Sequence, residues 1–243
     1  IFRKQYEQLG SEEPPASHTF NLDARQRFKD AMAKIAQLPL HTGPLDRPIT
    51  TFEIMNAIRS LKPGKATGLD CISAELLKAI ASEDHHEMLA LLATVFSRVL
   101  DTGAVPQAWQ TAVVKPVYKS GPRDQWENYR LISLTSVVGK VFEAVLAERI
   151  NVAFETAGIF AEEQFGFRKG RRCAHAQFIL AELIKARARL GLSTHVTFLD
   201  VRKAYPTTLR AAIMTKLHRM LSSLQAGGCD EAHPRVESHL PYV

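Results

Sequence analysis

Asp200 is the residue of this sequence that is best placed for metal-dependent chemistry. It ends the run THVTFLD (residues 194–200), whose β-branched and apolar residues are typical of a buried strand. A carboxylate at the C-terminal end of a strand can hold a divalent cation, since Mg²⁺ is commonly bound by one or two carboxylates together with substrate phosphates. Capping of the following turn is the alternative role, and the spacing alone leaves both roles open.

A second candidate site is a basic turn between two short apolar runs, residues 112–118 and 131–134. The cations around this turn are Lys115, Lys119, Arg123 and Arg130, and its aromatic residues are Trp126 and Tyr129. Arginine can bind phosphate through two hydrogen bonds, lysine acts as a point charge, and aromatic rings stack on bases. The pattern therefore indicates contact with a nucleotide or nucleic acid, with a solvated hairpin as the alternative.

The segment QFGFRKGRR (residues 164–172) is a third candidate. Gly166 and Gly170 let the backbone approach a ligand closely, and the cations of the segment are Arg168, Lys169, Arg171 and Arg172. Residues 161–219 carry 12 basic and 4 acidic side chains, whereas residues 1–160 carry 18 of each. Such a local excess favours binding of a polyanion, because each neutralised phosphate releases counterions. A solvated basic face is the alternative.

These candidate residues must be positioned by a mixture of helices and short strands. Thr50 and Glu53 form a capping-box pattern before an amphipathic helix that stops at Pro63 and Gly64. The other predicted helices cover residues 21–38, 72–80, 87–100, 137–156, 174–190 and 207–221. The two apolar runs around the basic turn predict a hairpin, and residues 194–200 predict one further strand. This order of elements indicates a predominantly helical protein of the α+β class.

The composition, with 46% apolar and 23% charged residues, is that of a folded protein. We expect residues 1–48 to be a linker arm with one helix, residues 49–221 to be the folded domain, and residues 222–243 to be an irregular tail. No run reaches the roughly 20 apolar residues that cross a bilayer, and no apolar leader is present, so no membrane partner is expected. Three widely spaced cysteines fit reduced thiols and an intracellular location, in the nucleus or the cytoplasm.

Five blocks of the sequence, taken in order, resemble those of the reverse transcriptases of LINE-type (non-long-terminal-repeat) retrotransposons. They are AIRSLKPGKATGLDCISAELLK, WQTAVVKPVYKSG, ENYRLISLTSVVGKVFEAVLAERI, EEQFGFRKGRRCAHA and TFLDVRKAY, within roughly residues 50–220. The resemblance implies an RNA-directed DNA polymerase, a nucleotidyltransferase, of a transposable element. The implied fold is the fingers and partial palm of a right-hand polymerase, with a fingers hairpin and one palm strand. The implied partners are an RNA template, a DNA primer and deoxynucleoside triphosphates, with Mg²⁺ as the cofactor.

The resemblance also implies roles for single residues. Asp200 is similar to the first catalytic aspartate, which holds the metal together with the backbone carbonyl of Val201. Tyr205 resembles the aromatic residue beneath the incoming sugar, and Lys119 and Arg130 resemble the hairpin residues that grip the triphosphate. The segment 164–172 is similar to a block that positions template and nucleotide. With the cations of the basic segments included, the expected template-contacting residues are Lys115, Gln164, Gly166, Phe167, Arg168, Lys169, Arg171 and Arg172.

Three departures from the family pattern leave an alternative open. Leu131 stands where the family usually has proline, and Pro206 stands where it usually has an acid. The aromatic-x-Asp-Asp turn that supplies the other metal-binding acids is not found in the 243 residues. We therefore expect a fragment of the polymerase that stops before this turn. The alternative is a non-catalytic, nucleic-acid-binding remnant of a decayed or repurposed mobile element.

The purified 243-residue chain is predicted to incorporate no deoxynucleotide on a primed RNA template. Two-metal catalysis needs acids that clamp both the attacking and the leaving oxygen, and Asp200 alone cannot do so. Primer extension, followed on a gel, is the measurement. Extension by the wild-type chain that disappears in Asp200→Ala would contradict the prediction.

Overall fold

A computed structural model of the protein describes residues 45–82, 86–201 and 208–225, together with five single positions between residues 26 and 34. The described residues fall into two compact units. Residues 45–199 belong to the first unit, and Asp200, Val201 and residues 208–225 belong to the second. Both basic candidate segments are therefore in the first unit, whereas the candidate metal-binding acid, Asp200, belongs to the second.

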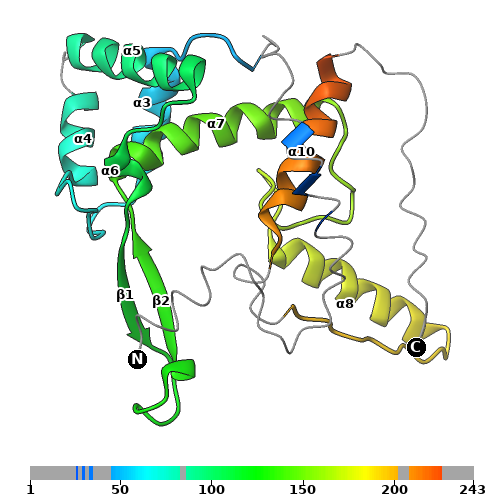
Figure 1. Cartoon of the computed structure of the whole chain (residues 1–243). Helices are drawn as coiled ribbons and strands as arrows, with labels where there is room; N and C mark the ends of the chain where they lie inside the picture. The colour runs from blue at the N-terminus through cyan, green and yellow to red at the C-terminus, as the bar shows by residue number, and fades with distance from the viewer. Residues whose placement is uncertain are drawn as a thin grey trace. The chain divides into compact units, whose positions relative to one another are not determined.

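The first unit contains helices and one hairpin in the order that the sequence predicts (Figure 1). Its helices are α3 (Thr51–Ser60), α4 (Ala74–Ser82), α5 (His86–Thr102), α6 (Gln107–Gln110), α7 (Val137–Thr156) and α8 (Cys173–Arg189). The hairpin consists of β1 (Val113–Tyr118) and β2 (Tyr129–Leu134), with the short helix η1 (Trp126–Asn128) between them. The second unit contains α10 (Arg210–Gln225). The helices predicted between residues 50 and 190 are confirmed to within a few residues at each end.

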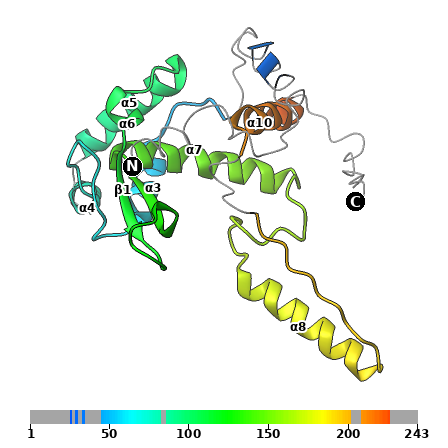
Figure 2. The same cartoon turned by 60° about the horizontal axis from the view of Figure 1, so that its bottom comes forward.

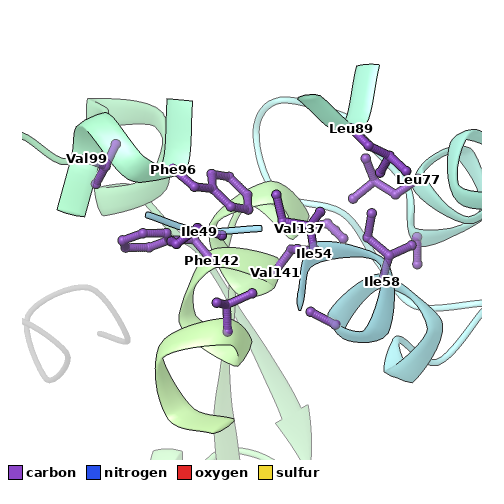
Figure 3. Close-up of a cluster of buried hydrophobic side chains, with 13 residues drawn as sticks. Ile49, Ile54, Ile58, Leu77, Leu89, Phe96, Val99, Val137, Val141 and Phe142 are labelled. Atoms are coloured by element: carbon purple, nitrogen blue, oxygen red, sulfur yellow. The ribbon is translucent and has the colours of Figure 1, made fainter. Parts of the chain in front are cut away.

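The hydrophobic core of the first unit lies between α3, α4, α5 and α7 (Figure 3). Ile54 and Ile58, one helical turn apart on α3, are fully buried, and so is Phe96 of α5. The ring of Phe96 contacts those of Trp109 and Phe142 edge-on, with centroids 5.6 and 5.4 Å away. Figure 2 shows α3, α4 and α5 gathered around the N-terminal half of α7. The core therefore lies next to the hairpin, which immediately precedes α7 in the chain.

A buried arginine joins α7 to the start of α3. Arg149 Nε donates to Glu53 Oε1 at 2.8 Å, and Nη2 donates to Oε2 at 3.0 Å. The remaining donors of this guanidinium reach the carbonyl oxygens of Leu45, Arg47 and Pro48. Glu53 also accepts a hydrogen bond from the backbone N–H of Thr50 at 2.9 Å, which confirms the predicted capping box. With its side chain only 5% exposed, Arg149 fixes the chain before α3, and α3 itself, against α7.

The predicted hairpin is confirmed as an antiparallel pair that runs from Val113 opposite Leu134 to Tyr118 opposite Tyr129. One further backbone bond, from Lys119 N–H to Asn128 O at 2.8 Å, continues the ladder. Hydrogen-bonded pairs alternate along an antiparallel ladder, so the pair formed by Pro116 and Leu131 is a non-hydrogen-bonded one. Proline breaks no ladder bond there, and the hairpin forms with leucine at position 131.

The strand predicted at residues 194–200 is not found in the structure. This segment makes no strand pairing with any residue that the structure describes, and the described sheet holds only β1 and β2. Phe198 and Leu199 are 83% and 94% exposed. Apolar, β-branched residues favour extended backbone, but a strand is stable only when a neighbouring strand satisfies its hydrogen-bonding groups. The expectation of one palm strand is therefore wrong for the described residues.

Two further predictions, the helices at residues 21–38 and 207–221, can be compared with the structure in part. The described positions within residues 21–38 are Gln26, Lys29, Asp30, Ala33 and Lys34, and all are helical. The other residues of that predicted helix lie outside the described ones. The helix predicted at residues 207–221 is found as α10 and continues to Gln225, inside the predicted irregular tail. The rest of that tail also lies outside the described residues.

Replacing Glu53 with glutamine is predicted to lower the free energy of unfolding at pH 7 by about 2–3 kcal/mol, because Arg149 would keep its buried charge without a counterion. The hydrogen bond from Arg149, supported by those from Thr50, lowers the pKa of Glu53 from 4.5 to about 2. A lowered folded-state pKa contributes stability that is complete above pH 4.5 and is lost as the pH falls towards 2. Urea unfolding at several pH values measures both effects.

The matched control is Glu143→Gln, because Glu143 is exposed on the same helix as Arg149. It should leave the free energy of unfolding nearly unchanged. Equal stabilities of the two variants, or an unchanged acid dependence in Glu53→Gln, would show that the ion pair does not hold α3 to α7.

Candidate nucleic-acid interface

The hairpin places three of its cations on one face. In an antiparallel pair, residues opposite each other share a face and residues two apart along a strand share it too. Arg130 lies opposite Val117, and Lys115 and Lys119 flank Val117 at a spacing of two. Lys115, Lys119 and Arg130 therefore form a basic face of the hairpin. All three side chains are exposed, and none has a hydrogen bond or ion pair with another residue that the structure describes.

Two tyrosine side chains on the opposite face of the hairpin hold the turn at its tip in place. The rings of Tyr118 and Tyr129 meet edge-on with centroids 5.6 Å apart. Their hydroxyl groups donate to the carbonyl oxygens of Gly121 at 2.5 Å and Arg123 at 2.9 Å. The guanidinium of Arg123 lies over the Tyr118 ring, 5.0 Å from its centroid. Tyr129 and Arg123, which the sequence offered as nucleotide contacts, are thus used in shaping the turn.

The basic turn formed by residues 159–172 differs from the hairpin, because acidic side chains engage most of its cations. Arg168 donates to both carboxylate oxygens of Glu155, at 2.8 and 2.7 Å, and to Ala161 O at 2.7 Å. Its guanidinium lies 5.3 Å from the centroid of the Phe160 ring. With a side chain 6% exposed, Arg168 is part of the internal structure of the turn. The hydrogen bond from Arg168 lowers the pKa of Glu155.

The other cations of this turn are engaged to different degrees. Arg171 forms an ion pair with Glu162, which lowers the pKa of that carboxyl, and donates to its backbone carbonyl oxygen at 2.5 Å. Lys169 pairs with Glu148 at 3.1 Å, but its side chain is 87% exposed, so the pair is weak. Arg172 is exposed at the N-terminus of α8, and its side chain has no partner among the described residues. Lys169 and Arg172 are the cations of the turn that remain accessible to a phosphate.

Three uncharged residues of the segment, Gln164, Gly166 and Phe167, are also exposed. Gln164 Nε2 lies 3.4 Å from Gly166 O, and Gly166 has open space where a side chain would be. Phe167 is 91% exposed and has a φ of +59°, a left-handed conformation that is uncommon for a residue other than glycine. The cations of this segment are evident from the sequence, but their acidic partners are not. These partners are Glu148 and Glu155 on α7, and Glu162.

The candidate metal-binding residues belong to a different compact unit from the two basic segments. Asp200 and Val201 are exposed residues of the second unit. The described residues contain no group of three or more histidine, cysteine, aspartate or glutamate side chains able to hold a metal ion. A carboxylate with a neighbouring backbone carbonyl still fits Mg²⁺, which takes oxygen ligands and keeps waters and substrate phosphates. Tyr205 lies outside the described residues.

No helix in the part of the chain that the structure describes is long and apolar enough to cross a membrane.

Comparison with known proteins gives one family match. The profile of the family described as "Reverse transcriptase (RNA-dependent DNA polymerase)" matches residues 117–225. The matched region begins within β1 and includes most of the hairpin, the basic turn, Asp200 and α10. It leaves out α3, α4 and α5, which build the core together with α7.

Several curated proteins are similar to a larger part of the chain. The "Probable RNA-directed DNA polymerase from transposon X-element" of Drosophila melanogaster is 28% identical over 88% of this chain and 24% of its own length. The corresponding protein from transposon BS of the same species is 25% identical over 83% of this chain and 22% of its own length. The Pol polyprotein of the type-1 retrotransposable element R2 from Popillia japonica is 26% identical over 72% and 22%. The chain spans about a quarter of the length of these relatives.

Arg168→Ala is predicted to loosen the turn, because it removes the partner of Glu155 and uncovers the Phe160 ring. Amide hydrogen exchange over residues 160–171 should become faster by on the order of ten-fold, since hydrogen bonds to charged groups are among the stronger ones. Arg172→Ala is the control and should leave exchange unchanged. Equal exchange in both variants would show that Arg168 does not hold the turn.

Proposed function

Residues 117–225 are a segment of a reverse transcriptase domain of the LINE-type retrotransposon kind, and on this premise we propose that the chain supplies the nucleotide- and template-binding part of an RNA-directed DNA polymerase. Its partners in this role are an RNA template, a DNA primer and deoxynucleoside triphosphates. In this proposal, residues 49–221 form the fingers and the first part of the palm.

The observation that carries the proposal is the basic face of the hairpin. Lys119 and Arg130 lie on this face near the tip, where they are exposed and have no partner among the described residues. A triphosphate needs such cations, because Arg binds phosphate oxygens through two hydrogen bonds and Lys adds a compact charge. The hydrogen bonds at the hairpin tip hold the backbone in shape, so that mainly the side chains of these cations have to be ordered upon binding. Lys115, farther from the tip, contacts the template.

The basic turn forms the second contact of the template. Lys169 and Arg172 are accessible to phosphates, whereas Arg168 and Arg171 hold the turn in shape. Gln164 and Gly166 lie on the same exposed segment, and Gly166 leaves room for a nucleic-acid backbone. The template role that the resemblance implies for this segment is therefore divided between residues that touch the template and residues that position them.

The candidate metal-binding residues belong to the second unit. The carboxylate of Asp200 and the carbonyl oxygen of Val201 are oxygen donors of the kind that Mg²⁺ prefers. When bound, the ion would neutralise charge on the nucleotide phosphates. Tyr205, five residues after Asp200, has the role of the aromatic residue beneath the sugar of the nucleotide.

A non-catalytic nucleic-acid-binding role is the second candidate. Pro206 stands in place of the acid that the family usually has after Tyr205, and it favours this role. Leu131, which stands where the family usually has proline, does not disturb the hairpin and so does not favour this role. Both candidates use the basic turn, but only the polymerase needs the hairpin to recognise a triphosphate, so nucleotide binding separates them.

Lys119→Ala and Arg130→Ala are each predicted to weaken binding of a fluorescent deoxynucleoside triphosphate in Mg²⁺ by about ten-fold, because each removes a charged hydrogen bond to phosphate. Binding of the corresponding monophosphate should change less. Fluorescence titration of the 243-residue chain measures both. The control is Arg98→Ala, which removes an exposed cation from α5.

If Lys119→Ala and Arg130→Ala bind the triphosphate as tightly as Arg98→Ala does, the hairpin is not the nucleotide-binding element. If the wild-type chain binds RNA but shows no preference for triphosphate over monophosphate, the non-catalytic role is favoured.

A further inference from the structure

Phe167 combines two features that are unfavourable for a folded chain unless something compensates for them. A phenylalanine ring that is 91% exposed leaves its apolar faces in contact with water. The φ of +59° at the same residue places its Cβ close to its own backbone, a conformation that costs free energy for residues with side chains. Such strain persists only where the surroundings impose it, and it is concentrated at sites that bind ligands.

The surroundings that impose this conformation are the hydrogen bonds of the basic turn. On the C-terminal side of Phe167, Arg168 is tied to Glu155, to Ala161 O and, at 3.5 Å, to Gln164 O. On the N-terminal side, the Gln164 side chain reaches Gly166 O. Both neighbours of Phe167 in the chain are thus held, and the ring is presented outwards. Its direction is set by hydrogen bonds within the protein that do not depend on a ligand.

We propose that Phe167 is a platform on which an unpaired base of a single-stranded nucleic acid stacks, an inference that rests on the proposed function and specifies one contact of the template. A base offers a π-face of the size of the ring, and stacking on an exposed aromatic side chain is independent of sequence. Lys169 and Arg172 lie two and five residues further along the chain and are accessible to the phosphates next to that base. Arg168 is a positioning residue: its charge is neutralised by Glu155, and it acts on the template through the conformation of Phe167.

The test uses the 243-residue chain and single-stranded RNA and DNA oligonucleotides that contain the fluorescent base 2-aminopurine, whose emission is quenched when it stacks. Phe167→Leu should lower the affinity by about ten-fold, within the range known for loss of one base–aromatic contact. The quenching upon binding should be lost, and the salt dependence of binding should be unchanged because no charge is removed. Phe167→Tyr keeps the ring and should behave as wild type. Double-stranded oligonucleotides, whose bases are already stacked, should show no difference between the variants.

The matched control is Phe178→Leu, which removes a ring that is 66% exposed on α8. It should retain wild-type affinity and quenching. The double replacement of Lys169 and Arg172 by alanine should give the opposite result to Phe167→Leu. The slope of log affinity against log salt should become less steep by about 1.4, because each lost phosphate contact on a single strand contributes roughly 0.7. Quenching at saturation should remain. Arg168→Ala should lose quenching with little change in slope, and Arg168→Lys should restore part of it.

Quenching and affinity in Phe167→Leu that equal those of Phe178→Leu would overturn the stacking role while leaving the proposed function intact. A wild-type chain that binds neither RNA nor DNA would overturn both. Circular dichroism establishes that the variants are folded, and the exposed position of the ring makes its removal compatible with folding.

Discussion

The ion pair between Arg149 and Glu53 is the constraint on which the rest of the first unit depends. A buried guanidinium is tolerated there because a carboxylate and three backbone carbonyls accept all the hydrogen bonds that it offers. These bonds fix α3 against α7, and the core closes between the two helices. Helix α7 in turn connects both basic elements: Ser136 caps it directly after the hairpin, and its acids Glu148 and Glu155 hold the basic turn.

The two basic elements use positive charge in different ways. On the hairpin, the tyrosine pair and the backbone of the tip provide the rigidity, and the cations of the basic face are left exposed. In the turn, the cations themselves provide the rigidity, and Arg168 and Arg171 are neutralised by the acids that hold them. The charge excess of residues 161–219 therefore overstates the charge that a phosphate backbone can reach. Electrostatic attraction depends on the accessible cations, and a count along the sequence does not distinguish them from the internal ones.

The parts of the fold that the sequence predicts are those set by local chemistry. The capping box of Thr50 and Glu53 starts α3, Ser136 starts α7, and Gly158 follows the end of α7 with a φ of +65°. Contacts between distant residues are not visible in such patterns, so neither the role of Arg149 nor the neutralisation of Arg168 could be predicted. The strand expected before Asp200 fails for the same reason, because pairing requires a partner that periodicity does not identify. The residue types in the sequence located the candidate site, but only the structure shows which of its cations are accessible.

The position of Pro116 determines how the hairpin can meet another β-strand. At a non-hydrogen-bonded pair, the backbone groups of both residues point away from the partner strand, towards the free edges of the sheet. The free edge of β1 therefore lacks a donor at its centre, where the proline ring also obstructs an approaching chain. The free edge of β2 retains both groups of Leu131. Two hairpins that paired through their β2 edges would expose only β1 edges, each interrupted by Pro116, so edge-to-edge growth would end at two copies and would not continue into a fibre.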